Sequence, residues 1–116
     1  MKTIAKISEY DIQCAVVEFL EMQYPEVKFT ISPITKLTIP QAVRQKKLGY
    51  RSGSPDLIIF AARNSFNGLT IEFKSDGGRL STTQKEWKEY LINEGYKYSC
   101  CFTIEEGISV IKEYFK

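Results

Sequence analysis

The sequence of 116 residues predicts an α/β fold in one domain, 1–116, with a mixed central sheet flanked by helices. Helical and strand patterns alternate along the second half of the chain, which favours a sheet with helices on both sides. A hydrophobic fraction of 43% and a charged fraction of 26% are those of an ordinary globular protein. The expected order of elements is α-β-β-β-α-β-α.

The first half of the chain contains one helix and one strand that the pattern defines. Apolar residues at helical spacing predict a helix from Ser8, which can cap it, to Tyr24, and Pro25 ends it. Alternating polar and apolar residues predict a strand over 27–34. The stretch after Pro40, up to Leu48, is either a short helix or an ordered loop.

The second half begins with a loop over 49–55, where glycine, serine and proline gather. Strands are expected over 57–61 and 69–74, and the turn between them predicts an antiparallel hairpin. Three further elements complete the sheet and the helices that pack on it: a helix from about Ser81 to Asn93, a strand over 97–102 and a helix over 104–114.

The composition removes several classes of site. Without histidine, the chain has no Ser/His or Cys/His nucleophile and no imidazole ligand. Three cysteines, two of them adjacent, suggest neither a disulfide framework nor a zinc site, so we expect reduced and mostly buried thiols. The apolar runs are short and the N-terminus lacks a signal-like segment, which indicates a soluble, cytoplasmic protein. The compact form of the chain is consistent with a phage or other mobile-element origin, and thus with a bacterial or phage-infected cell.

An acid and a lysine lie two residues apart in the strand over 69–74. Because side chains alternate along a strand, Glu72 and Lys74 share one face, and Asp56 begins the adjoining strand at the same end. Two close carboxylates repel unless a cation lies between them, and Mg²⁺, or Mn²⁺ in its place, suits oxygen ligands that include the Phe73 carbonyl. Lys74 would then orient the attacking water and stabilise charge on a phosphate.

Each of these residues also has an ordinary structural interpretation. Asp56 follows Gly-Ser-Pro and is a common turn residue, and Glu72 beside Lys74 is also the pattern of a solvated ion pair. Only the surrounding motifs favour the catalytic interpretation.

Three motifs occur in order: Gly49-x-x-x-Gly53-x-Pro55-Asp56-Leu57, Ile71-Glu72-Phe73-Lys74 and Gly78-Arg79-Leu80-Ser81-x-x-Gln84-x-x-Trp87. Together they resemble the virus-type replication-repair nuclease domain, VRR-NUC, of the PD-(D/E)XK nuclease superfamily, over nearly the whole chain from Ser8. The resemblance implies a restriction-endonuclease-like core and a metal-dependent DNA endonuclease. Asp56, Glu72 and Lys74 match the catalytic positions.

Two further residues match the family pattern. The family places a glutamate on the first helix, in a pattern like Glu9-x-x-Ile12-Gln13, and helical geometry puts Glu9 on the apolar stripe. The alternative is an acid that the helix dipole stabilises. Gln84 would approach the site from the following helix, and it also completes a capping box with Ser81.

The partner implied by this chemistry is DNA. No acid occurs between Glu26 and Asp56, so the intervening basic residues would neutralise phosphates in a salt-sensitive, sequence-independent way. A homodimer is expected, because symmetric cutting of branched or junction DNA needs two sites. The candidate DNA-binding residues are Lys36, Arg44, Lys46, Lys47, Arg51 and Ser54.

Two other functions remain open on the sequence. The chain is alternatively a non-catalytic DNA-binding module of the same fold, which the intact Asp56, Glu72 and Lys74 disfavour. The third option is a sequence-specific restriction-type nuclease, for which no element with base-edge contacts is evident.

Overall fold

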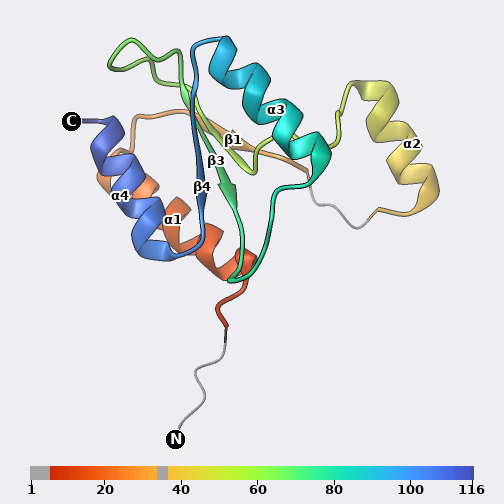
Figure 1. Cartoon of the computed structure of the whole chain (residues 1–116), viewed down its shortest axis with the longest axis horizontal. Helices are drawn as coiled ribbons and strands as arrows, with labels where there is room; N and C mark the ends of the chain where they lie inside the picture. Colours follow the sequence, from red (N-terminus) through yellow and green to blue (C-terminus); the bar gives the residue numbers. More distant parts are fainter. Residues whose placement is uncertain (1–5, 34–36) are drawn as a thin grey trace, which may run out of the picture.

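The computed structural model describes residues 6–33 and 37–116, and within them it confirms the predicted α/β fold. The order is α-β-α-β-β-α-β-α, because the stretch left open between helix and loop is a helix (Figure 1). The elements are α1 (Glu9–Gln23), β1 (Phe29–Ile31), α2 (Ile39–Leu48), β2 (Leu57–Ile59), β3 (Leu69–Phe73), α3 (Thr82–Asn93), β4 (Lys97–Cys101) and α4 (Ile104–Tyr114).

The four strands form one mixed sheet in the order β1-β2-β3-β4. The predicted hairpin is confirmed, since β2 pairs antiparallel with β3 and Leu57 lies opposite Ile71. β1 pairs antiparallel with the other edge of β2 and is shorter than the strand expected over 27–34. β4 runs parallel to β3, with Glu72 opposite Cys100. All five residues of β3 are buried, which makes this strand the centre of the fold.

The alternation of side chains along β3 divides the molecule into two layers. Ile71 and Phe73 point into the main core, where they meet Ile12, Val16 and Ile111 from α1 and α4. Glu72 points to the opposite face, which α3 partly covers (Figure 1). The hydrophobic effect therefore orders one side of the sheet, and the other side is available for chemistry.

Helix α2 stands apart from these layers at one end of the molecule (Figure 1). Its ends are well formed: Thr38 and Gln41 make a capping box, Pro40 lies in the first turn, and Gly49 closes the helix with a φ of 114°. None of its residues is buried.

The expectation of mostly buried thiols is wrong, because only Cys101 of the three cysteines is buried. Cys14 is exposed, because it lies on the outward side of α1, away from the stripe formed by Ile12, Val16 and Leu20. Trp87 is only half-buried, and its indole N–H donates to the Ser52 carbonyl at 3.0 Å. Leu91 does enter the interior, at 8% exposure. In the described part of the chain, no helix has the length and apolar character needed to cross a membrane.

The α1–α4 contact depends on a missing side chain. A Cβ added at buried Gly107 would lie 2.5 Å from a methyl carbon of Val16, whose own side chain is fully buried and stiff. We expect Gly107→Val to lower the free energy of unfolding by about 1–3 kcal/mol through overpacking. Thermal and urea unfolding measure the effect. Ser109→Val, at an exposed position of the same helix, is the matched control, and equal losses in both variants would contradict the packing argument.

Candidate active site

Asp56 lies directly opposite Glu72, one step beyond the Leu57–Ile71 pair of the β2–β3 register. Its Oδ2 accepts a hydrogen bond from the Phe73 backbone N–H at 2.8 Å, so the carboxylate is fixed against β3. The neighbouring backbone is fixed as well. The Ser32 N–H donates to the Asp56 carbonyl at 3.1 Å, and the Ser32 hydroxyl contacts the Ser54 hydroxyl at 2.8 Å.

Glu72 is a buried acid, with 2% of its surface exposed. Its Oε1 accepts a hydrogen bond from Gln84 Nε2 at 3.0 Å, which confirms that the glutamine reaches this strand from α3. Gln84 also accepts from the Ser81 N–H at 2.8 Å, so it serves the capping box at the same time. Glu72 Oε2 has no hydrogen-bond partner although it is buried. A buried carboxylate oxygen without a partner is costly unless a proton or a cation joins it.

Electrostatics favour the protonated form of Glu72 in the metal-free protein. Burial, hydrogen bonding to Asp56 and repulsion from that carboxylate raise the pKa of Glu72 to about 9, and Lys74 only partly offsets this. Glu72 is therefore protonated at neutral pH when no cation is bound, and a cation bound beside it would displace this proton.

Lys74 follows β3 directly and extends its pairing, because its backbone N–H donates to the Cys101 carbonyl at 3.0 Å. Alternation along the strand places it on the same face as Glu72, as predicted. Its side chain is half-buried, and its positive charge lowers the pKa of Glu72. An ammonium group and a carboxyl pair thus occupy one end of the sheet.

A cleft of about 170 Å³ opens onto this pair. Its walls come from the Ser32 turn, the loop before β2 and the N-terminus of α3. The loop and the helix approach closely, since a Cβ at Gly53 would lie 2.8 Å from the Thr83 backbone. Besides the two acids, the polar lining consists of hydroxyls and an amide, from Ser32, Tyr50, Ser52, Ser54, Ser81, Thr83 and Gln84. Hydroxyls beside a helix N-terminus suit the oxygens of a phosphate.

Glu9 differs in part from its expected position. It is exposed rather than buried on the apolar stripe, because it lies in the first turn of α1, beyond the core. Its Oε2 nevertheless faces the end of β3, 3.4 Å from the Ser75 N–H, and its charge contributes to the raised pKa of Glu72. Within 6–33 and 37–116, no group of three or more Asp, Glu, Cys or His side chains is close enough to hold a metal ion.

The remaining oxygen donors still fit a hard cation. Asp56 and Glu72 face each other, Glu72 Oε2 has no partner, and Mg²⁺ typically takes one or two protein carboxylates and keeps several waters. Two acids and a strand carbonyl therefore suffice for such an ion, with Glu9 in an outer position.

The predicted DNA-binding residues surround the cleft unevenly. Arg44, Lys46 and Lys47 are exposed on α2, and the Arg51 guanidinium donates to the Lys46 and Tyr50 carbonyls just after it. Ser54 lines the cleft itself. Lys36 lies outside the described residues.

Several polar residues near the cleft could not be predicted from the sequence pattern. Ser32 secures Asp56, and nothing in its local pattern distinguishes it from a strand-end serine. The Tyr98 hydroxyl is buried without a partner, and burial and the nearby Glu72 raise the pKa of this phenol. Both lie close only through strand pairing. Further exposed basic residues follow β3 or lie on α3: Arg79, Lys85 and Lys88.

Comparison with known proteins agrees with this geometry. The model of the VRR-NUC domain family matches residues 3–103. A solved structure described as a VRR_NUC domain protein is 32% identical, covers 96% of this chain and 90% of its own, and has a TM-score of 0.81. A second, described as a VRR_NUC domain, is 18% identical over 93% of this chain and 99% of its own, with a TM-score of 0.61, and shows the fold alone. No curated protein matches the sequence.

The raised pKa of Glu72 makes metal-free stability depend on pH. Between its usual pKa of 4.5 and its folded value of about 9, folding takes up a proton, so stability falls as the pH rises through this range. Glu72→Gln has no such proton to lose. In EDTA we expect the free energy of unfolding of this variant to equal that of the wild type near pH 4.5. At mildly alkaline pH it should exceed the wild-type value by roughly 1–3 kcal/mol.

Urea unfolding at a series of pH values measures the difference between the two proteins. Glu18→Gln, at an exposed position of α1, is the control and should follow the wild-type profile. A difference in stability between Glu72→Gln and wild type that does not change with pH would contradict the raised pKa of Glu72.

Proposed function

Because the chain belongs to the VRR-NUC domain family, a nuclease family of PD-(D/E)XK type, we propose that it is a metal-dependent DNA endonuclease with Asp56, Glu72 and Lys74 at its centre. One observation carries the assignment of these residues. The buried Glu72, with one oxygen lacking a partner, lies opposite the half-buried Asp56 in a hydroxyl-lined cleft. If Glu72 served only in a structural ion pair, both of its carboxylate oxygens would be expected to have hydrogen-bond partners.

The cation that fits this pair is Mg²⁺, with Mn²⁺ as a substitute. Asp56, Glu72 and the Phe73 carbonyl would hold it, and Glu9 would stand behind them as an outer acid. When bound, the ion supplies Lewis-acid activation of the phosphate and of water. Gln84 and the Phe73 N–H set the orientation of the two carboxyl groups in advance, so little reorganisation would be needed when a cation replaces the proton on Glu72.

The chain's own groups account for the other requirements of phosphodiester hydrolysis. The Lys74 ammonium would orient the attacking water and stabilise the negative charge that develops on the phosphate. The hydroxyls of Ser81 and Thr83, at the positive end of α3, would contact the non-bridging phosphate oxygens. The small cleft would admit one phosphate of the backbone and leave the rest of the DNA outside.

The surface around the cleft supports a structure-selective substrate, namely branched or junction DNA in replication, repair or recombination. Exposed basic residues on α2 and Arg51 would contact phosphates at a distance from the cut, and Ser54 would contact a phosphate in the cleft. Nothing in the sequence resembles a helix that reads base edges, so DNA shape would determine selectivity. Symmetric cutting of a junction requires two sites, and we propose that the active form is a homodimer in the cytoplasm.

The first prediction from this assignment concerns catalysis. Asp56→Asn and Lys74→Ala should each lower the cleavage rate by at least about 100-fold while DNA affinity stays within severalfold of wild type, because both groups act on the reacting phosphate. Cleavage of labelled duplex, flap, single-stranded and four-way-junction DNA with Mg²⁺, Mn²⁺ or EDTA provides the measurement.

Asp11→Asn, at an exposed position of α1, is the matched control and should cut normally. Cleavage by Lys74→Ala at the wild-type rate would remove Lys74 from the mechanism. Binding without cutting in every metal would instead support a non-catalytic module, and cutting at one fixed sequence would support a restriction-type enzyme.

A second prediction concerns the DNA contacts of α2. Arg44→Ala should weaken duplex binding severalfold and reduce the slope of log Kd against log salt concentration by about one, because one phosphate contact is lost. Fluorescence anisotropy at several salt concentrations measures both quantities. Lys116→Ala, at the exposed C-terminus, should change neither, and an unchanged slope for Arg44→Ala would show that this arginine does not contact DNA.

A further inference from the structure

Helix α2 exposes an apolar stripe that nothing in the described chain covers. Ile39 and Val43 are 82% and 50% exposed, and with Ala42 and Lys46 they follow the i, i+3, i+4, i+7 spacing of one helix face. Isolated helices of this length are marginal in water, and most helices in proteins gain their stability from packing. The caps at Thr38 and Gly49 define the ends of α2 without supplying that packing.

A groove of matching character lies beside α3. Ile58 and Phe60 come from β2 and its end, Trp87 and Tyr90 come from α3, and Tyr96 closes one side. Phe60 and Tyr90 remain 58% and 59% exposed, although both are large apolar side chains. The hollow measures about 400 Å³ and is the kind of concave aromatic surface into which an amphipathic helix docks.

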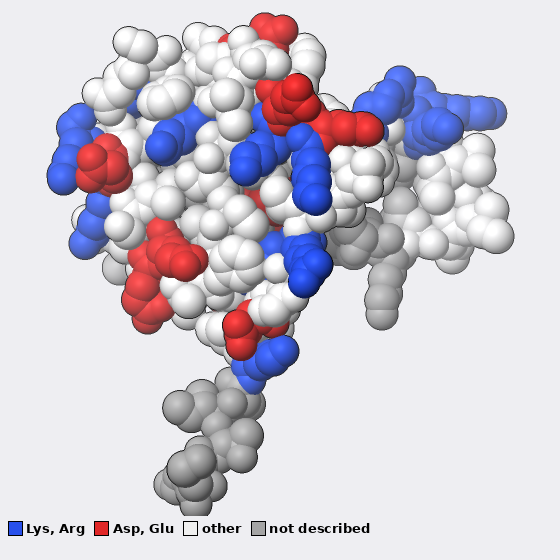
Figure 2. All heavy atoms as spheres, in the orientation of Figure 1, with Lys and Arg blue, Asp and Glu red and all other residues white. Residues whose placement is uncertain are grey.

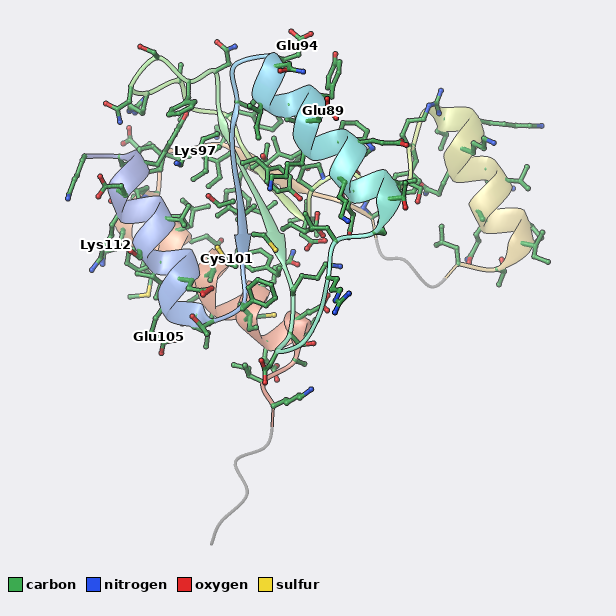
Figure 3. The ribbon with its side chains drawn as sticks, viewed as in Figure 1. Glu89, Glu94, Lys97, Cys101, Glu105 and Lys112 are labelled. Carbon is green, nitrogen blue, oxygen red and sulfur yellow. The ribbon has the colours of Figure 1, made fainter. Side chains whose placement is uncertain are left out.

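The charges of the two surfaces are opposite. Glu86, Tyr90 and Glu94 follow each other at i, i+4 and i+8 on α3, so an acid stands at each end of the exposed tyrosine. Glu89 adds negative charge on the outer side of the same helix (Figure 3). Helix α2 contains Arg44, Lys46 and Lys47 and no acid. Figure 2 shows the blue end of α2 next to red side chains over α3.

The helix cannot reach the groove of its own chain in this fold. The loop that returns from α2 is fixed at Ser52, whose carbonyl accepts from the Trp87 indole at 3.0 Å, and at Gly53, which packs against the Thr83 backbone. These contacts keep α2 away from the body (Figure 1). A negatively charged groove rim also disfavours DNA as the occupant, because phosphates would be repelled.

We propose that α2 of one copy of this chain docks in the groove of a second copy, and the reverse, to form a two-fold symmetric dimer with exchanged arms. Ile39 and Val43 enter the aromatic hollow, and Lys46 and Lys47 lie against the glutamates of α3. Each copy offers both surfaces, so the contact is made twice and closes on itself. The inference rests on the homodimer of the proposed function and identifies its interface.

The test uses charge reversal, with mass measured by size-exclusion chromatography and light scattering. One variant carries Lys46→Glu and Lys47→Glu, and the other carries Glu86→Lys and Glu94→Lys. In each variant alone, both contacts bring like charges together, and the dissociation constant of the dimer should be at least tenfold higher than that of the wild type. In an equal mixture, both contacts join opposite charges again, so a mixed dimer should form with nearly wild-type stability.

Val43→Asp tests the apolar half of the contact. It should also give a monomer, and circular dichroism should show that this monomer is folded. Glu18→Lys with Glu21→Lys, on the exposed side of α1, is the control and should remain dimeric. A monomeric wild type at tens of micromolar, a dimeric Val43→Asp, or a mixture that stays monomeric would overturn the proposal. Because mass and not cleavage is measured, these results stand whether or not the chain cuts DNA.

Discussion

Burial of one acid in the central strand is the constraint from which the site follows. Glu72 occupies a position where a strand in the middle of the sheet normally carries an apolar residue, and its oxygens must be satisfied by groups from elsewhere. Gln84 satisfies one oxygen from α3, and Asp56 lies opposite across the hairpin. The helix cap, the hairpin register and the Ser32 contacts that fix Asp56 therefore serve a single purpose. They hold two carboxyl groups together that would separate in water.

The sequence predicted most of this because the decisive elements are local. Alternation along 69–74 placed Glu72 and Lys74 on one face, and antiparallel pairing with the strand that precedes it in the sequence brought Asp56 to the same end. The capping box of Ser81 and Gln84 fixed the start of α3 within one residue. Gln84 could be assigned two roles because its backbone position, next to a helix N-terminus, permits its amide to accept from the cap and donate to Glu72 simultaneously.

What the sequence could not predict depends on long-range pairing or on surfaces without a partner. Ser32 and Tyr98 reach the site only through β1 and β4, whose pairing has no short-range signal. Glu9 obeys its helical periodicity but lies beyond the end of the core, where the same angular position is exposed. Helix α2 was ambiguous because periodicity implies burial, and this helix buries nothing within its own chain.

Helix α2 takes part in two proposed contacts, one with DNA and one with another copy of the chain. Different sides of the helix can make them. At about 100° per residue, Ile39, Val43 and Lys46 lie on one side of the helix, whereas Arg44 points nearly opposite. A dimer that buries the first side leaves Arg44 and the following Arg51 on the outer surface, available to phosphates. Docking would also stabilise the helix that presents these arginines, since its own length gives it little stability. Assembly and substrate binding would then be linked, because a monomer would present its basic residues on a marginal helix, and a dimer would hold two such helices and two clefts in one fixed geometry.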